Sequence, residues 1–276
     1  MNKKIERKEN PERIVIEMTA ECNLCCRMCP RNHIKLPKGF MKTELWTKLI
    51  DEITEKFPNS IVLPFWRGES VLHPHFTKLC KYAFQKGIRM HFSTNGHIIP
   101  GNVKQLLHHF EFLTFSIHTP QGFKHANEIV QMKEQTRMTQ ISFVESEKTV
   151  EYLNSLLSQP DMAGFDSIRL YKEHTINGIF GSDGMEHEKR IFCPKLLDTL
   201  VIAIDGSISR CNHLWETENK WNANHLSISE IWQSPFMNEI MVNYPDSHCM
   251  RCSQWHGHTM GERWEFANGK INHVRF

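Results

Sequence analysis

A short cysteine-rich stretch near the start of the chain constrains the fold more than any other feature. Its three cysteines Cys22, Cys26 and Cys29 stand at the spacing C-x3-C-x2-C. A loop of this kind places three thiolates around one face of a cubane iron–sulfur cluster, and a fourth thiolate would close the cluster. Three leave one iron open to a substrate. The alternative is a zinc knuckle or a set of buried thiols, although zinc sites usually use paired C-x2-C hooks.

The composition narrows the class of protein. The 276 residues carry a formal net charge of only +2, which does not favour a nucleic-acid or membrane partner. A hydrophobic fraction of 40% is enough for a sizeable core. Nine cysteines without an export signal or a membrane-length apolar run indicate a reducing, cytoplasmic setting. The cysteines are therefore expected to bind metal or clusters rather than to form disulfides.

Short apolar runs alternate with helical patterns over the first two-thirds of the chain. The expected strands are residues 14–18, 61–66, 89–94, 112–117, 141–144 and 167–171. The expected helices begin with one capped by Thr43 and continue with residues 75–86, 103–110, 127–135 and 148–158. Six strands with about five intervening helices predict a parallel α/β sheet.

Polar residues gather where these strands end. They include the cysteine loop, Glu69, Ser93, Asn95, His118, Glu145 and residues 172–174. In α/β barrels the carboxyl ends of the strands carry the active site. A closed barrel needs eight such units, so six units predict an open, partial barrel.

The last third of the chain contains a second cysteine set. Gly206 and Cys211 form a G-x4-C unit within a hairpin expected to turn at Asp205-Gly206. A helix is expected from about residue 229 to 241, and Cys249 and Cys252 form a C-x2-C hook. With Cys193 they supply four thiolates, which suit either an iron–sulfur cluster or a structural zinc ion.

The first part of the chain resembles the radical S-adenosylmethionine (radical SAM) enzymes. The resemblance rests on the three-cysteine loop and on Arg67-Gly68-Glu69-Ser70, which stands where the family usually has Gly-Gly-Glu-Pro. It implies that the open iron of a [4Fe–4S] cluster binds SAM. It also implies that Glu69 and backbone groups near Gly68 bind the ammonium group of SAM, which needs an anion or carbonyls when it leaves water. Arg67 and Ser70 depart from the family pattern.

The same resemblance implies further SAM contacts at the ends of the strands. Ser93 and Asn95 lie in a stretch that resembles the family's third strand ending. Ser116 is expected to hydrogen-bond the ribose, and Glu145 to hold the ribose hydroxyls. Met28 stands where an aromatic residue often stacks near the adenine.

The last third resembles the SPASM/twitch domains that carry auxiliary clusters in this family. The short form implied here holds one auxiliary [4Fe–4S] cluster on Cys193, Cys211, Cys249 and Cys252. The expected fold is a partial (β/α)6 radical SAM barrel followed by a small α+β twitch/SPASM-like domain. The expected boundaries are a tail at residues 1–12, the barrel at 13–190 and the auxiliary domain at 191–276.

The combination most resembles the 2-deoxy-scyllo-inosamine dehydrogenases and related carbohydrate-modifying enzymes. It implies an oxidoreductase in which a 5′-deoxyadenosyl radical abstracts hydrogen from a small carbohydrate or aminocyclitol. The auxiliary cluster would accept an electron, and a flavodoxin or ferredoxin would supply one. Expected substrate contacts are His118, Arg169, Tyr171, Lys172, Glu173 and His174. Because strand side chains alternate between faces, not all of the last group can point into the site.

Other functions stay open at this point. A carbohydrate dehydratase or epimerase would use the same cofactors, although an epimerase needs a hydrogen-atom donor that Cys25 and Cys80 are poorly placed to supply. Peptide modification is a further alternative, with little sequence before the first strand for leader recognition. A non-enzymatic metal-binding protein is the most remote alternative. It predicts a protein that does not cleave SAM.

Overall fold

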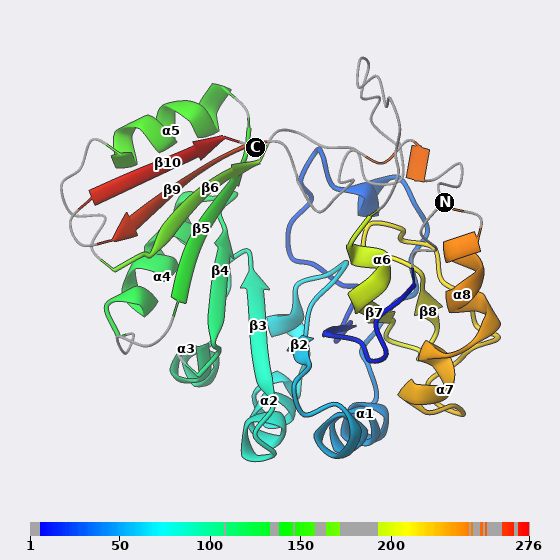
Figure 1. The fold of residues 1–276 in the computed structure, drawn as a ribbon. Helices are drawn as coiled ribbons and strands as arrows, with labels where there is room; N and C mark the ends of the chain where they lie inside the picture. The colour runs from blue at the N-terminus through cyan, green and yellow to red at the C-terminus, as the bar shows by residue number, and fades with distance from the viewer. Residues whose placement is uncertain are drawn as a thin grey trace. The chain divides into compact units, whose positions relative to one another are not determined.

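The computed structural model describes residues 6–107, 109–132, 138–145, 147–157, 164–171, 193–242, 244, 249–250, 252, 261–267 and 270–275. The chain forms two compact units, each assembled from two separate segments (Figure 1). The first unit comprises Met1–Met90 and Thr175–His258, and the second comprises His91–His174 and Thr259–Phe276.

The sheet of the first unit is centred on strand β1 (Arg13–Ile16). It pairs in parallel with β2 (Ile61–Leu63) on one side and with β7 (Thr199–Ile202) on the other. Strand β8 (Ile208–Ser209) pairs antiparallel with β7, and the first two residues of β3 (Arg89–Thr94) pair with β2. Apart from the first residue of β1, every residue of β1 and β7 is at most 4% exposed. This burial explains why both strands have nearly continuous apolar sequences.

Helices α1 (Thr43–Lys56) and α2 (Phe76–Gln85) lie side by side in this unit (Figure 1). Each buries the apolar stripe expected of an amphipathic helix. The indole Nε1 of Trp46 donates to the carbonyl of Leu79 at 3.0 Å, which joins the two helices in the core. A 3-10 turn, η2 (Ser70–Leu72), precedes α2.

Among the described residues, the later part of the first unit includes three short labelled helices. They are α6 (Lys195–Asp198), α7 (Ile228–Trp232) and α8 (Pro235–Val242). The single helix expected near residues 229–241 is therefore wrong. The chain breaks at Gln233-Ser234, and Pro235, which has no backbone N–H to donate, begins the second helix.

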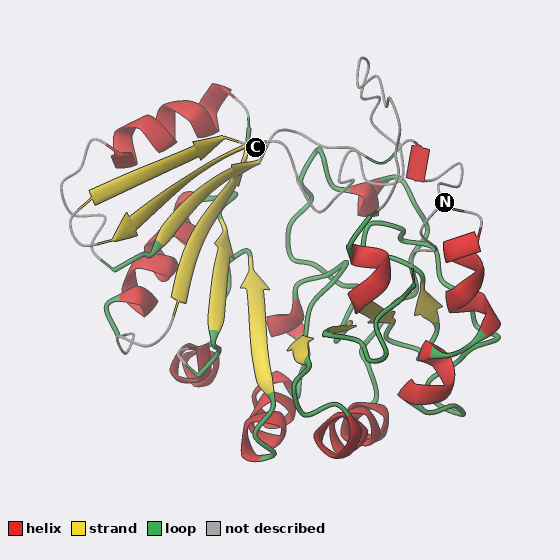
Figure 2. Ribbon diagram, in the orientation of Figure 1, coloured by secondary structure: helices red, strands yellow, loops and turns green. Residues whose placement is uncertain are grey.

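The second unit is built on one mixed sheet, whose strands fan out side by side in Figure 2. Strands β3, β4 (Phe112–Ser116), β5 (Met138–Val144) and β6 (Ser167–Tyr171) are parallel. Two further strands extend this sheet beyond β6. β9 (Gly261–Ala267) pairs antiparallel with β6, and β10 (Lys270–Arg275) pairs antiparallel with β9.

The three helices of the second unit follow β3, β4 and β5 in turn. They are α3 (Gly101–Leu107), α4 (Pro120–Val130) and α5 (Glu147–Leu157). Alternate strand residues such as Phe92, Phe115 and Phe143 are at most 1% exposed and form an apolar face. The ring of Phe92 stacks on Phe110, just after α3, with centroids 4.9 Å apart. The other face of the sheet is polar and is described below.

The predicted order of strands and helices in an α/β fold is confirmed, with local differences. Lys42 rather than Thr43 is the N-cap of α1, without a side-chain hydrogen bond. Helix α4 begins at Pro120 rather than near residue 127, because the Thr119 side chain accepts from the Gly122 N–H and caps it. Strands β9 and β10 are not anticipated by the sequence patterns. None of the described helices is long and apolar enough to cross a bilayer.

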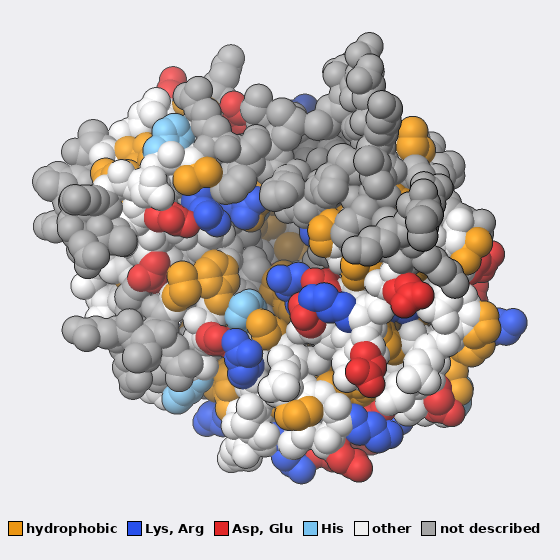
Figure 3. All heavy atoms as spheres, in the orientation of Figure 1, with side chains coloured by type: hydrophobic (Ala, Val, Ile, Leu, Met, Phe, Trp, Pro, Cys, Tyr) orange, Lys and Arg blue, Asp and Glu red, His pale blue; other side chains and the backbone are white. Residues whose placement is uncertain are grey.

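Charged side chains are mixed on the surface. On the face drawn in Figure 3, basic and acidic groups are interspersed rather than gathered into one large field. This distribution agrees with the formal net charge of +2.

Candidate active site

The loop after β1 carries the first three cysteines. The backbone N–H of Cys29 donates to the carbonyl of Cys26 at 3.0 Å, and the Asn32 side chain donates to the same carbonyl at 2.8 Å. A 3-10 turn, η1 (Pro30–Asn32), follows at once, with proline at its first position. Cys25 is exposed, and its thiol donates to the Asn32 side chain at 3.2 Å. The loop is therefore closed on itself, with Cys25 outside the triad.

The three predicted ligands lie within electrostatic reach of one another. Burial, followed by the neighbouring thiols Cys29, Cys22 and Cys25, raises the pKa of the Cys26 thiol to about 11. The positive charge of Arg31 lowers the pKa values of all three thiols. Its guanidinium is anchored on the carbonyl of Ala20 at 3.1 Å. Three thiols converging beside one cation fit a negatively charged cluster, whose binding would release their protons.

Glu69 approaches this loop from the end of the segment after β2. It is 4% exposed, and its backbone N–H donates to the carbonyl of Glu21 at 2.7 Å. Its carboxylate caps the following turn through the Val71 N–H, at 3.5 Å. Burial is the main cause that raises the pKa of the Cys22 thiol, and the Glu69 charge contributes. The carboxylate therefore lies next to the first cluster ligand.

Gly68 makes this close approach possible. A Cβ at this position would lie 2.3 Å from the carbonyl oxygen of Thr19 and 2.4 Å from that of Glu21. Both contacts are with backbone, which cannot turn aside as a flexible side chain would. Glycine is therefore required where the two segments meet.

We expect Gly68→Ala to separate Glu69 from the cysteine loop. Overpacking of this kind costs about 1–3 kcal/mol. SAM binding to the reconstituted protein, measured by equilibrium dialysis, should weaken along with thermal stability. Gly101→Ala is the matched control, since a Cβ there meets nothing within 4 Å. Equal behaviour of the two variants would contradict the structural role of Gly68.

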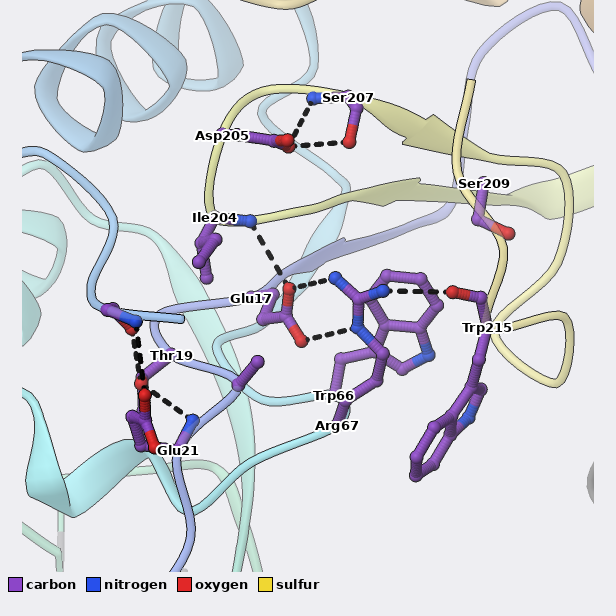
Figure 4. Close-up of polar contacts among 12 residues, drawn as sticks. Glu17, Thr19, Glu21, Trp66, Arg67, Ile204, Asp205, Ser207, Ser209 and Trp215 are labelled. Atoms are coloured by element: carbon purple, nitrogen blue, oxygen red, sulfur yellow. Dashed lines mark hydrogen bonds and ion pairs between the residues drawn. The ribbon is translucent and has the colours of Figure 1, made fainter. Parts of the chain in front are cut away.

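Arg67, which replaces a glycine of the family pattern, forms a buried ion pair with Glu17. Nε donates to Oε1 at 2.7 Å and Nη2 to Oε2 at 2.5 Å, with both side chains at most 1% exposed. The pair extends to the auxiliary region: Arg67 Nη1 donates to the carbonyl of Trp215 at 2.9 Å, and the Ile204 N–H donates to Glu17 at 3.2 Å. Figure 4 shows Arg67 between these groups.

Trp66 strengthens this link. Its indole Nε1 donates to the carbonyl of Asn212 at 2.7 Å, and the Arg67 guanidinium lies 4.0 Å from the centre of its ring. Asn212 directly follows Cys211, a predicted auxiliary ligand. The segment that carries Gly68 and Glu69 is thus hydrogen-bonded to the loop that follows Cys211.

The second cysteine set also comes together in the first unit. Cys193 and Leu196 are buried, and Cys211, Cys249, Met241 and Tyr244 pack against them. Burial is the main cause that raises the pKa of Cys211 to about 12, and Cys193 and Cys252 contribute to this rise. The Cys252 N–H donates to the carbonyl of Cys249 at 3.3 Å. All four predicted ligands therefore share one neighbourhood.

Polar groups surround Cys211 as well. The His213 N–H donates to the Cys211 sulfur at 3.4 Å, and Lys195 lowers the pKa of the same thiol. The Lys195 ammonium contacts Nε2 of His213. N–H donors and cations near the sulfurs tune the potential of an iron–sulfur cluster, so this set fits a redox centre.

In the described part of the chain, no three or more His, Cys, Asp and Glu side chains stand as ligands around one metal ion. A cubane cluster differs from a single ion, because it takes each thiolate on a different iron.

The remaining predicted contacts lie in the second unit. The hydroxyls of Ser93 and Ser116 are 3.4 Å apart, so these two come together. Asn95 is buried, and its side-chain oxygen accepts from the His97 N–H at 2.8 Å, which closes a turn. Glu145 is exposed, and its N–H donates to the carbonyl of Tyr171 at 2.7 Å.

His118 is exposed, and desolvation by the surrounding protein still lowers the pKa of its ring. The Arg169 guanidinium lies 4.6 Å from the centre of the Tyr171 ring. Met28 is half-buried in the cysteine loop of the first unit. Lys172, Glu173 and His174 fall outside the described residues. The roles predicted for all these side chains stay predictions.

Several neighbours of the predicted residues are not singled out by the sequence patterns. Arg31 follows the cysteine triad within two residues, and this proximity is the signal that could have identified it. Glu17 pairs with a residue fifty positions away, and Arg263 lies on the unanticipated strand β9. Neither has a local signal of its own.

Comparison with known proteins agrees with these observations. A family model described as "Radical SAM superfamily" matches residues 16–159, and an "Iron-sulfur cluster-binding domain" model, SPASM, matches residues 193–253. A stretch of 87 residues is 33% identical to the tungsten-containing aldehyde ferredoxin oxidoreductase cofactor-modifying protein of Pyrococcus furiosus. The match covers 31% of this chain and 24% of that protein, so the chain spans about a quarter of this curated relative.

Solved structures share the fold at low sequence identity. BtrN in complex with AdoMet and 2-DOIA has a TM-score of 0.62 at 14% identity, covering 91% of this chain and 93% of that one. Streptococcus suis SuiB bound to the precursor peptide SuiA has a TM-score of 0.68 at 14% identity, covering 92% and 72%. The enzyme anSMEcpe with bound AdoMet has a TM-score of 0.62 at 15% identity, covering 90% and 89%.

These matches confirm the expected domain types. The three-cysteine loop belongs to a SAM-binding [4Fe–4S] domain, and the later cysteines belong to a SPASM-type domain for an auxiliary cluster. The proposed domain boundaries stay a prediction. Because the matching superfamily model covers more than half of the sequence, the chain belongs to the radical SAM superfamily.

Proposed function

We propose that the chain is a radical SAM oxidoreductase that dehydrogenates a small carbohydrate or cyclitol, with the auxiliary cluster as electron acceptor. The observation that carries this proposal is the convergence of Cys193, Cys211, Cys249 and Cys252 in one neighbourhood. Four thiolates close a cubane cluster, which leaves no iron for a substrate and suits electron transfer. BtrN, solved in complex with AdoMet and 2-DOIA, shares this fold.

The cofactors and the chain have separate tasks. When bound, the two clusters supply the electron that cleaves SAM to a 5′-deoxyadenosyl radical and the acceptor for the electron that the substrate radical releases. The buried carboxylate of Glu69 binds the ammonium group of SAM, which would otherwise lose its hydration without compensation. Arg31 places a positive charge beside the three thiolates. An alcohol would lose one hydrogen atom to the radical, one electron to the auxiliary cluster and one proton to solvent.

The link through Trp66 and Arg67 supports electron transfer between the two cluster regions. These residues bond to the carbonyls of Asn212 and Trp215, which lie in the loop after Cys211, and are followed directly by Gly68 and Glu69. A fixed connection of this kind keeps the two ligand loops at a constant separation. A flexible connection would let the separation between the redox centres vary.

Peptide modification is the second candidate. SuiB, solved with its precursor peptide, has the higher TM-score of the two neighbours with substrates named above. Because these likenesses are at 14% identity, they support the fold for both candidates equally. The comparison of substrates described next therefore decides between the two candidates.

The experiment that tests the proposal measures 5′-deoxyadenosine formed by anaerobically reconstituted protein with SAM and a flavodoxin- or ferredoxin-type donor. A panel of sugars and cyclitols is compared with a panel of peptides. We expect a carbohydrate to stimulate the reaction and to lose two hydrogens, measured as product mass. Loss of water would indicate a dehydratase, and an unchanged mass with altered stereochemistry would indicate an epimerase. Stimulation by peptides alone would overturn the carbohydrate proposal.

A further inference from the structure

One row of side chains crosses the polar face of the second unit's sheet. In the strand register, Ser116 on β4 is opposite Ser142 on β5, and Ser142 is opposite Arg169 on β6. Arg169 is in turn opposite Arg263 on β9. Residues directly opposite on neighbouring strands share a face, so these four side chains lie in a continuous row.

The row is distinct from the apolar face. Ser116 and Ser142 exchange a hydrogen bond at 3.1 Å, and Ser93 joins them at 3.4 Å from Ser116. Phe143 and Leu170 directly follow Ser142 and Arg169 in the sequence. They therefore point to the opposite face, and they are 1% and 7% exposed. The hydroxyl groups therefore lie on the face that does not carry the apolar core.

The row ends in two arginines that face each other. Like charges directly opposite on antiparallel strands are destabilising. Arg263 is ion-paired with Glu265 at 2.9 Å, and Arg169 lies over the Tyr171 ring. Glu265 therefore offsets one of the two positive charges. An anionic ligand between the two guanidinium groups would offset the repulsion between them.

The phenol of Tyr171 lies close to both guanidinium groups. Burial raises the pKa of Tyr171, whereas Arg169 and Arg263 both act to lower it. The geometry agrees, since the Arg169 guanidinium lies 4.6 Å from the centre of the Tyr171 ring and Arg263 is opposite Arg169 in the sheet. Gly261, opposite Tyr171 on β9, adds no side chain beside it. Two cations and a hydroxyl donor thus converge at the carboxyl end of β6.

We propose that Arg169, Arg263 and Tyr171 form a subsite for an anionic group of the substrate, a carboxylate or a phosphate. The planar guanidinium groups match either anion through paired hydrogen bonds, and the phenol adds a third donor. The serine row offers hydrogen bonds to neutral hydroxyls. This inference rests on the proposed function and sharpens it: the preferred substrate is an acidic or phosphorylated carbohydrate rather than an aminocyclitol, whose ammonium the arginines repel.

The test is ligand binding to the reconstituted holoenzyme with SAM, measured by isothermal titration calorimetry. The probes are glucuronate, glucose 6-phosphate, glucose and glucosamine, with inorganic phosphate as a competitor. We expect an anionic sugar to bind more tightly than glucose and glucosamine. The tighter of the two anions identifies the source as carboxylate or phosphate. If neither anion binds better than glucose, the subsite is overturned.

Substitutions show which side chains are responsible for binding the anionic sugar. Arg263→Gln and Arg169→Gln should each weaken the anionic probe about 10- to 100-fold without changing glucose binding. Glu265→Gln should strengthen the anionic probe, because it removes the carboxylate that competes for Arg263. This gain cannot come from misfolding. Arg89→Gln, at the exposed start of β3, removes the same charge and should leave both affinities unchanged.

The same samples separate this inference from the proposed function. Arginine-dependent binding of an anion without stimulated 5′-deoxyadenosine formation would retain the subsite and contradict the carbohydrate reaction. Stimulation by glucosamine or a neutral sugar, unchanged in Arg263→Gln and Glu265→Gln, would retain the reaction and overturn the subsite.

Discussion

Replacing Arg67 with alanine is expected to lower the free energy of unfolding by about 3–5 kcal/mol, because it leaves the buried Glu17 charge uncompensated. Both side chains are at most 1% exposed, so water cannot replace the lost partner. The Trp215 carbonyl would also lose its hydrogen bond from Arg67, and Glu17, which accepts from the Ile204 N–H, would no longer be held in place. The measurement is anaerobic urea unfolding of the cluster-loaded protein, followed by cluster absorbance and tryptophan fluorescence.

Two controls define the origin of this loss. The double variant Glu17→Leu/Arg67→Met removes both charges together and should recover much of the loss, since a buried pair is often replaceable by apolar residues. Lys104→Ala breaks the surface pair with Glu128, whose atoms are 2.6 Å apart with side chains 33% and 40% exposed. That exposed pair should contribute little to the free energy of unfolding, because solvent screens it. If the losses in unfolding free energy of the two single variants, at Glu17 and at Arg67, simply added up to the loss of the double variant, the two side chains would not be coupled.

Replacing Cys26 with alanine is expected to abolish SAM cleavage while leaving the auxiliary cluster in place. The variant keeps only two of the three thiols that converge on the first cluster. Iron content should fall from about eight to about four atoms per chain, because each cubane holds four irons. Iron and sulfide analysis and 5′-deoxyadenosine formation check these two outcomes independently.

Cys25→Ala is the matched control, one residue away. Its thiol is exposed and hydrogen-bonded to Asn32, outside the triad. This variant should retain full iron content and SAM cleavage. If Cys25→Ala lost the first cluster and Cys26→Ala kept it, the assignment of the triad would be wrong.

Much of the fold follows from local sequence patterns. Strand β6 occupies the predicted residues 167–171, and the hairpin turn at Asp205-Gly206 is present with Gly206 at φ +81°. These features succeed because apolar periodicity and turn residues act over a few positions. The start of α4 also has a local signal, because Thr119 is a good N-cap residue and proline follows it at the first helical position.

Other features depend on contacts between distant residues. Asn268-Gly269 between alternating segments is a hairpin signal, but nothing local indicates that β9 joins β6. Arg67 was recognised only as a departure from a glycine, and its partner Glu17 is not marked by spacing. The cysteine ligands were predicted because their spacing is itself local. Only the register of the sheet shows that Arg169 and Arg263 lie opposite each other.

The central position of β1 has a consequence for how the chain is made. β1 leaves the ribosome well before its second neighbour, β7: Arg13 bonds to Asp198, just before β7, at 3.1 Å across 185 residues. At ordinary rates of translation this interval is roughly 10–40 s. Throughout it one edge of β1 is an open template for association with other chains. Until β7 has been synthesised, the nascent chain therefore has an unpaired strand edge directly before its cysteine loop.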